Sequence, residues 1–408
     1  MTHRAHWIWL QKALGFGASQ TLSLLETFGD AQSVYDATVY PTSADLTNEQ
    51  RRRLADKDLT DAFAECEKLD ALGAWMITPE DALYQQLFEG MFAPPVVMYG
   101  LGERFDPSDA PVVAVVGTRR HDEDGAVATC RLSAGLAAGG AVIVSGGAQG
   151  LDSLALTAAL DVGGRCITFQ ACGIDVNYPK PCESLRRRLL ENGGIVLTEF
   201  TTGLPAFRHH FKIRNRLIAA SARGVLVTQA PIGSGAVMSA NWAREQGRDV
   251  FAVPGAVGKE CTAGSNELLK DGARPVTNAA DILIDYVPLY PTVINIAAAV
   301  KAEDQAQTRY RRALSETDTV SAIPPSAPIV QKVAHPPIEQ ATPVPLPKDA
   351  CDEARTIYIA LERESKTASE LTRETGLPIA TVLSNLTRLE LRGVIVCGPG
   401  QRYAIRTQ

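Results

Sequence analysis

Short apolar runs alternate with amphipathic stretches through the middle of the chain. The apolar runs cover residues 112–117, 141–147, 165–171, 194–200, 224–230 and 249–255. Helical spacing of apolar positions follows at residues 151–162, 181–191, 208–221 and 234–246. Apolar strands separated by helices are typical of a parallel sheet that is covered on both faces. Because such crossovers are right-handed, this part is predicted to be an α/β, Rossmann-like doubly wound domain with a parallel sheet.

Residues 1–75 show helical patterns and short turns instead of strand runs. Residues 10–29, LQKALGFGASQTLSLLETFG, predict two helices joined by a turn at 15–17. This arrangement suits a small SAM-like or helix–hairpin–helix domain, in which turn amides can contact phosphate. Lys12 is basic, but the second helix offers no basic residue near the turn. A packing or partner-binding role is therefore at least as well supported as contact with DNA.

The periodicity of the α/β domain, placed at residues 76–290, fades towards its end. Residues 324–347 contain eight prolines. A segment so rich in proline cannot build a core, so residues 291–348 are predicted to be a semi-extended linker.

A last compact unit is predicted at residues 349–408. Three helical patterns precede two strand patterns around a Gly-Pro-Gly tip, which is the plan of a winged helix. The third helix of such a unit ordinarily reads a DNA groove. Acidic and basic residues balance at eight each here, however, which favours packing or partner contact over recognition of duplex DNA.

Charge and composition narrow the class of protein. The chain holds 46 acidic against 40 basic residues, so bulk charge excludes indiscriminate binding to nucleic acid and leaves a localised patch. No window of 18 uninterrupted apolar residues occurs, so neither a signal peptide nor a membrane span is expected. Eight cysteines without C-x-x-C and only six histidines predict reduced thiols in a cytoplasmic protein and no metal site.

A local patch of this kind stands at residues 200–244, which contain no Asp or Glu. The basic residues there are Arg208, Lys212, Arg214, Arg216, Arg223 and Arg244, and His209 and His210 stand beside Phe207 and Phe211. Arginine forks match phosphate oxygens and aromatic faces stack on bases, so this composition favours a polyanion. A solvated helix face over buried phenylalanines is the alternative.

Glycine-rich loops are predicted at the carboxyl ends of the strands, where ligands of such sheets bind. They include residues 117–120, 145–150, 172–180, 233–235 and 253–255. Backbone N–H groups and helix dipoles at such turns favour anions. No G-x-x-x-x-G-K-[ST] occurs and no G-x-G-x-x-G follows the first strand, so neither common nucleotide-binding motif is present. No histidine stands in a loop beside Ser145, Ser234 or Asp152, so the sequence predicts no catalytic residues and no cofactor.

Several of these segments together resemble a known family. VVGTRR, SGGAQGLDSLALTAAL, GIDVNYP, FKIRNRLIAASA and GSNELLKDGA occur in the order and spacing of the DNA-processing protein A (DprA/Smf) family. The resemblance covers essentially the full length. It implies a binding protein and not an enzyme: single-stranded DNA is bound without sequence preference, and the recombinase RecA is loaded onto it during natural transformation. It also implies a homodimer formed through the Rossmann-like domain.

The resemblance also implies which residues contact DNA. The family's motif positions are occupied by Arg119, Lys180, Phe211, Arg214 and Asn215. The arginines and the lysine would meet phosphates, and Phe211 would stack on a base. Neighbouring loop and helix residues complete the predicted DNA-binding set: Gly117, Arg120, Gly146, Gly147, Lys212, Ser234 and Gly235.

The chain departs from the family's pattern at a few positions. Leu156 stands where the family usually has histidine, Cys172 where glycine is common and Ala236 where serine is usual. None of these changes removes a positive charge. Two alternatives remain. One is a nucleotide-binding or nucleotide-processing enzyme on a related Rossmann-like fold, and the other is a transcription regulator that acts through the winged helix.

Overall fold

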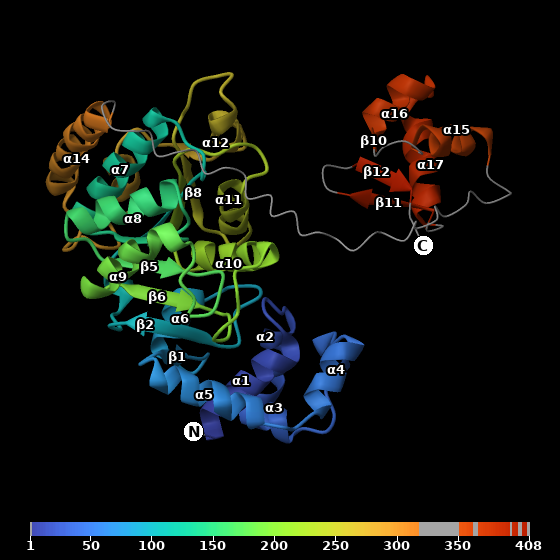
Figure 1. The fold of residues 1–408 in the computed structure, drawn as a ribbon, viewed down its shortest axis with the longest axis horizontal. Helices are drawn as coiled ribbons and strands as arrows, with labels where there is room; N and C mark the ends of the chain where they lie inside the picture. The colour runs from blue at the N-terminus through green and yellow to red at the C-terminus, as the bar shows by residue number, and fades with distance from the viewer. Residues whose placement is uncertain (1, 318–350, 362–365, 392–393, 399–401, 406–408) are drawn as a thin grey trace. The chain divides into compact units, whose positions relative to one another are not determined.

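The computed structural model describes residues 2–317, 351–361, 366–391, 394–398 and 402–405 (Figure 1). The chain divides into two compact units, Met1–Ala322 and Ile323–Gln408. In the described part of the chain, no helix is both long enough and apolar enough to cross a membrane.

A single sheet organises the first unit, and its strand order is β1-β2-β6-β5-β4-β3-β7-β8-β9. The strands are β1 Trp75–Ile77, β2 Met98–Gly102, β3 Val112–Val116, β4 Val142–Ser145, β5 Cys166–Phe169, β6 Ile195–Thr198, β7 Gly224–Val227, β8 Asp249–Ala252 and β9 Arg274–Pro275. From β6 to β9 every pairing is parallel. The chain runs outward from β3 to β6 and then returns to β7 beside β3, so the doubly wound prediction is confirmed. The strand order reverses between β3 and β7, which is where such folds bind ligands.

One edge of the sheet differs from the prediction of a parallel sheet. β2 pairs antiparallel with β6, and β1 pairs antiparallel with β2. Both strands precede β3, the first strand of the parallel part of the sheet. They are therefore not joined to their neighbours by the crossover helices that make strands parallel. The ring of Trp75 packs over Gly100, its partner on β2, so a Cβ on Gly100 would stand 2.3 Å from the nearest ring atom.

Helices cover both faces of the sheet because the strands bury both sides of their pleat. They are α7 Glu123–Ala138, α8 Leu151–Asp161, α9 Glu183–Glu191, α10 Arg208–Ala220, α11 Gly235–Glu245, α12 Glu260–Lys270 and α13 Ala280–Tyr286, with α6 Ala82–Phe88 before β2. Val113 and Val115 pack in one core with residues of α7 and α8, whereas Ala114 and Val116 pack in another with residues of α10 and α11. Figure 1 shows α7 and α8 on one side of the strands and α11 and α12 on the other.

Part of the predicted linker is instead a helix, α14 Ile296–Thr317, which packs against α7 (Figure 1). Its buried face is made of Ala299, Ala302 and Ala306. Glu303 is buried as well, and its carboxylate accepts a hydrogen bond of 2.5 Å from the N–H of Ala279. The linker prediction at 291–348 is therefore wrong over 296–317. The proline-rich residues 324–347 lie outside the described part.

Five helices form the N-terminal part: α1 Thr2–Leu14, α2 Gln20–Phe28, α3 Ala31–Asp36, α4 Asn48–Ala55 and α5 Thr60–Ala71. They share a continuous core with the β1–β2 edge of the sheet. The amide of Gln11 on α1 donates to the carbonyls of Val97 and Glu199, at 3.2 and 2.8 Å. The N–H of Gly17 donates to the Glu199 carboxylate at 2.9 Å. This turn amide is thus used inside the protein, which favours a packing role for the turn.

The second unit has its own small core around Ile357, Leu371 and Leu386. Its elements are α15 Asp352–Leu361, β10 Lys366–Thr367, α16 Ala368–Thr375, α17 Ile379–Leu391, β11 Ile395–Gly398 and β12 Arg402–Ile405. Thr367 caps α16 in a reciprocal capping box with Glu370. Three helices followed by a β11–β12 hairpin confirm the predicted winged helix.

Candidate nucleic-acid interface

A cleft of about 1080 Å³ opens at the carboxyl ends of the strands, beside the switch point between β3 and β7. The loop after β3, the first turns of α10 and the start of α11 form its walls. The predicted residues that line it are Gly117, Arg119, Arg120, Phe211, Lys212, Arg214, Asn215, Ser234 and Gly235. Segments far apart in the sequence thus meet at one site, as the loop analysis predicted.

The cleft presents positive charge that is free to bind an anion. Arg119, Arg120, Arg208 and Lys212 line it and are exposed. Within the described ranges, none of these four has a carboxylate oxygen within 4.0 Å. The Arg119 guanidinium lies 4.9 Å from the ring centre of Phe211, where a cation–π contact orients it. Cations and an aromatic face are therefore offered together.

The opposite wall carries compensated charge. Lys259 lines the cleft but pairs with Asp122 at 2.8 Å and with Asp124 at 3.3 Å. The hydrogen bond from Lys259 holds the pKa of Asp122 well below its ordinary value, so this carboxylate stays charged. The unpaired positive charge of the cleft consequently lies, within the described ranges, on the side of α10 and the loop after β3.

Arg214 has a structural position that differs from the predicted phosphate contact. It is 3% exposed, and one terminal nitrogen donates to the carbonyls of Gly146 and Phe169, both at 2.6 Å. Burial lowers the pKa of Arg214 to about 10, which leaves the guanidinium charged at neutral pH. Burial also raises the pKa of the neighbouring Asp152, and Arg214 opposes that rise. Arg214 fixes α10 to the ends of β4 and β5, with one edge facing the cleft.

The glycines of the rim are required by packing inside the protein. A Cβ on Gly146 would stand 2.3 Å from a terminal nitrogen of Arg214, and one on Gly117 would stand 2.6 Å from Leu151. Gly147 has φ +60°, and a Cβ on it would stand 2.7 Å from the Thr168 hydroxyl oxygen. Neither Gly146 nor Gly147 lines the large cleft, although both line the smaller cavity beside it, so their contact with DNA stays a prediction.

Ser234 and Asn215 position the start of α11. The Ser234 hydroxyl accepts from the N–H of Val237 at 3.4 Å and so caps the helix. The Asn215 amide donates to the carbonyl of Gly235 at 3.1 Å, which ties α10 to α11. Both residues line the cleft, and each gives one side-chain hydrogen bond that helps to hold its shape.

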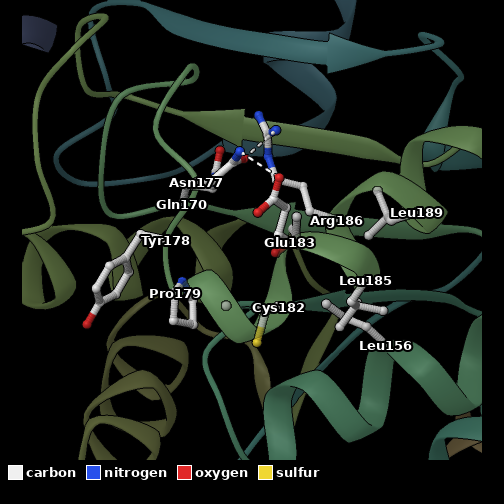
Figure 2. Close-up of a pocket in the computed structure, with 13 residues that line it drawn as sticks. Leu156, Gln170, Asn177, Tyr178, Pro179, Cys182, Glu183, Leu185, Arg186 and Leu189 are labelled. Carbon is white, nitrogen blue, oxygen red and sulfur yellow. Dashed lines mark hydrogen bonds between the residues drawn. The ribbon is translucent and has the colours of Figure 1, made fainter.

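A smaller cavity of about 30 Å³ lies next to the cleft, and Figure 2 shows its lining. Leu156, which replaces the family's histidine, lies there with Leu185 and Leu189. The Gln170 side-chain oxygen is buried and has no hydrogen-bond partner among the residues that the structure describes. The volume suffices for about one or two water molecules. The apolar wall at Leu156 has no group for acid–base chemistry.

Tyr178 lines both the cleft and the smaller cavity and was not predicted as a site residue. The residue is 43% exposed, and its ring meets the Phe211 ring edge-on, with centroids 5.8 Å apart. Tyr178 belongs to the motif GIDVNYP, so the sequence offered a means of finding it. Lys180 follows Tyr178 by two residues and starts a short 3-10 helix, Lys180–Cys182. Its side chain is exposed, and Lys180 lines neither the cleft nor the smaller cavity.

His210 underlies the cleft wall and leads to a prediction on pH. It is buried and stacks on Phe200 with centroids 4.2 Å apart, and burial lowers the pKa of its imidazole below the ordinary 6.5. His210 takes up a proton near pH 6.5 in the unfolded chain but only at lower pH in the native state. Its contribution to the free energy of unfolding is therefore full above pH 6.5 and declines as the pH falls below that value. Urea unfolding at pH 7.5 and 5.5 should show a smaller loss for His210→Phe than for the parent. Equal losses would contradict this.

The fold and the cleft define a class: a Rossmann-like α/β protein with a cationic switch-point cleft, joined to a winged helix. Residues 75–287 match the family described as DNA recombination-mediator protein A, and residues 340–401 match the DprA winged helix domain. The chain belongs to this family of DNA recombination mediators, which confirms the resemblance.

Individual relatives agree with this assignment. Protein Smf of Synechocystis sp. is 30% identical over 340 residues, covering 81% of this chain and 80% of that protein. The putative DNA processing protein DprA of Mycobacterium tuberculosis is 39% identical over 241 residues, covering 56% of this chain. The match spans 62% of that relative's length. The X-ray structure of DprA from Streptococcus pneumoniae superposes with a TM-score of 0.59 at 30% identity, covering 69% of this chain and 97% of that one.

Proposed function

We propose that this protein binds single-stranded DNA in the switch-point cleft, without sequence preference, and loads RecA onto it during DNA uptake and recombination. The observation that carries the proposal is the set of four exposed cations without carboxylate partners beside the Phe211 ring. Cations that track a phosphate backbone next to an aromatic face are the usual means of binding single strands.

The chemistry of the cleft supports single strands over duplex DNA. The ring of Phe211 can stack only on a base whose face is open, and a duplex hides these faces in its interior. Arginine and lysine contacts with phosphate carry no sequence information. Binding should therefore depend little on sequence.

A binding role is also favoured over catalysis by the state of the hydroxyl groups near the cleft. The Ser145 hydroxyl donates to the carbonyl of Val115 at 2.7 Å, and that of Ser234 caps α11. Neither is paired with a base. We further propose, from membership of the family, that the protein acts in the cytoplasm as a homodimer with RecA as its partner. These statements go beyond the cleft and need their own tests.

The test is fluorescence anisotropy with single- and double-stranded 30-mers of several sequences in a salt series, with and without RecA. We expect preference for single strands, similar affinity across sequences, and a log–log salt slope of about −0.7 per phosphate contacted. Faster assembly of RecA filaments on prebound DNA would support loading. Tight binding of a mononucleotide with turnover, and no binding of oligonucleotides, would favour the nucleotide-processing alternative. Duplex binding by residues 349–408 would favour a regulator.

A further inference from the structure

A second aromatic surface lies just outside the cleft, one helical turn before Phe211. Phe207 precedes α10 and is 47% exposed. Its ring is parallel to that of the exposed His209, with an interplanar angle of 6° and centroids 5.8 Å apart. Ala206 and Arg208, next to it in the chain, line the cleft. The Phe207–His209 pair therefore stands at the mouth of the proposed DNA site.

Buried rings hold this pair in place. His210 contacts Phe207 edge-on at 5.2 Å and His209 edge-on at 4.4 Å. His210 in turn stacks on the buried Phe200, whose ring centroid lies 4.8 Å from that of Phe16, in the turn between α1 and α2. A ligand that stacks on the exposed rings does not have to order them first, so less conformational entropy is lost on binding.

The surroundings of the pair are cationic. Arg208 and Lys212 flank it, and both are exposed without an ion-pair partner among the described residues. No Asp or Glu occurs anywhere in residues 200–244. A purely apolar partner would gain nothing from these unpaired cations. The combination fits a ligand that carries both flat aromatic faces and regular negative charge, which describes a single nucleic-acid strand.

We propose that Phe207 and His209 form a second base-stacking platform, which continues the path of the single strand from Phe211 out of the cleft along the start of α10. The inference rests on the proposed function and adds to it a direction for the strand. One helical turn rises about 5.4 Å, which lies between one and two of the 3.4 Å steps of a stacked strand. Neighbouring bases can thus reach Phe211 and Phe207 in turn.

The test uses Phe207→Ala and Phe207→Trp in the full chain, with oligo-dT of increasing length. We expect Phe207→Ala to weaken binding about 5- to 150-fold once the oligonucleotide is long enough to leave the cleft, and to leave the shortest bound oligonucleotides unaffected. Phe211→Ala should weaken binding at every length. Because stacking involves no counterions, the salt slope of Phe207→Ala should equal that of the parent. Phe207→Trp should restore affinity, and its fluorescence should be quenched by a stacked base.

Phe92→Ala is the matched control, since Phe92 is 73% exposed and lines neither cavity. It should bind all lengths like the parent. Parent-like binding of long oligonucleotides by Phe207→Ala, with the unfolding midpoint unchanged, would overturn the platform while the cleft assignment stands. Absence of oligonucleotide binding by the parent protein would remove the proposed function and the platform with it.

Discussion

Replacing Arg216 with alanine should destabilise the protein by about 3–5 kcal/mol. Arg216 on α10 donates to the Glu199 carboxylate at 2.5 Å, and the two side chains are only 4% and 2% exposed. The same carboxylate accepts the N–H of Gly17, between α1 and α2. Without Arg216, a buried negative charge would keep a single donor. The loss is therefore the cost of an uncompensated charge as well as of a lost contact.

A double-mutant cycle separates these contributions. Urea unfolding at pH 7.5 should show that Arg216→Ala costs much less in the Glu199→Gln background, because no charge is then left buried. Lys12→Ala is the control: Lys12 and Asp61 also pair across helices, but their side chains are 61% and 75% exposed. That change should cost less than about 1 kcal/mol. A loss below 1 kcal/mol for Arg216→Ala would show that Glu199 does not depend on it.

The ion pair also shows why the roles of the basic residues in 200–244 were only partly predictable from the sequence. Arg214, Arg216, Arg208 and Lys212 all belong to the same acid-free basic segment. Their charge alone therefore predicts one role for all four. The helix separates them, because Arg214 and Arg216 point inward towards Gly146 and Glu199 while Arg208 and Lys212 face solvent. The partner of Arg216 lies before this segment, and only the fold brings it near.

The fold was predictable to the extent that its signals were local. Apolar runs such as 112–116 and 224–227 predict buried parallel strands without any information from the rest of the chain. Thr367 followed by Glu370 likewise predicts the start of a helix. The helix α14 was missed because its buried face consists of alanines, which barely register as an apolar stripe. The antiparallel edge was missed because the direction of Met98–Gly102 depends on its pairing with β6, about a hundred residues later.

Changing Arg119 and Arg120 together to alanine should abolish most of the affinity for single-stranded DNA. Each guanidinium is exposed in the cleft and free of carboxylates within the described ranges, so each can give a charge-assisted bond to phosphate. Hydrogen bonds to charged groups contribute about 1.5–3 kcal/mol each, which predicts a loss of about 100-fold or more. The loss should be the same for every sequence.

The salt dependence is the sharper measurement, because it reports the number of phosphates neutralised and not affinity alone. Loss of two phosphate contacts should make the log–log slope shallower by about 1.4. Arg51→Ala with Arg244→Ala is the matched control: it removes the same charge from exposed positions outside the cleft. If the net charge of the protein alone set the affinity, the salt slopes of both double variants would become shallower by the same amount. That result would contradict the cleft as the binding site. A change confined to the Arg119 and Arg120 variant means that these two side chains contact phosphate, since removal of equal charge elsewhere leaves the released counterions unchanged.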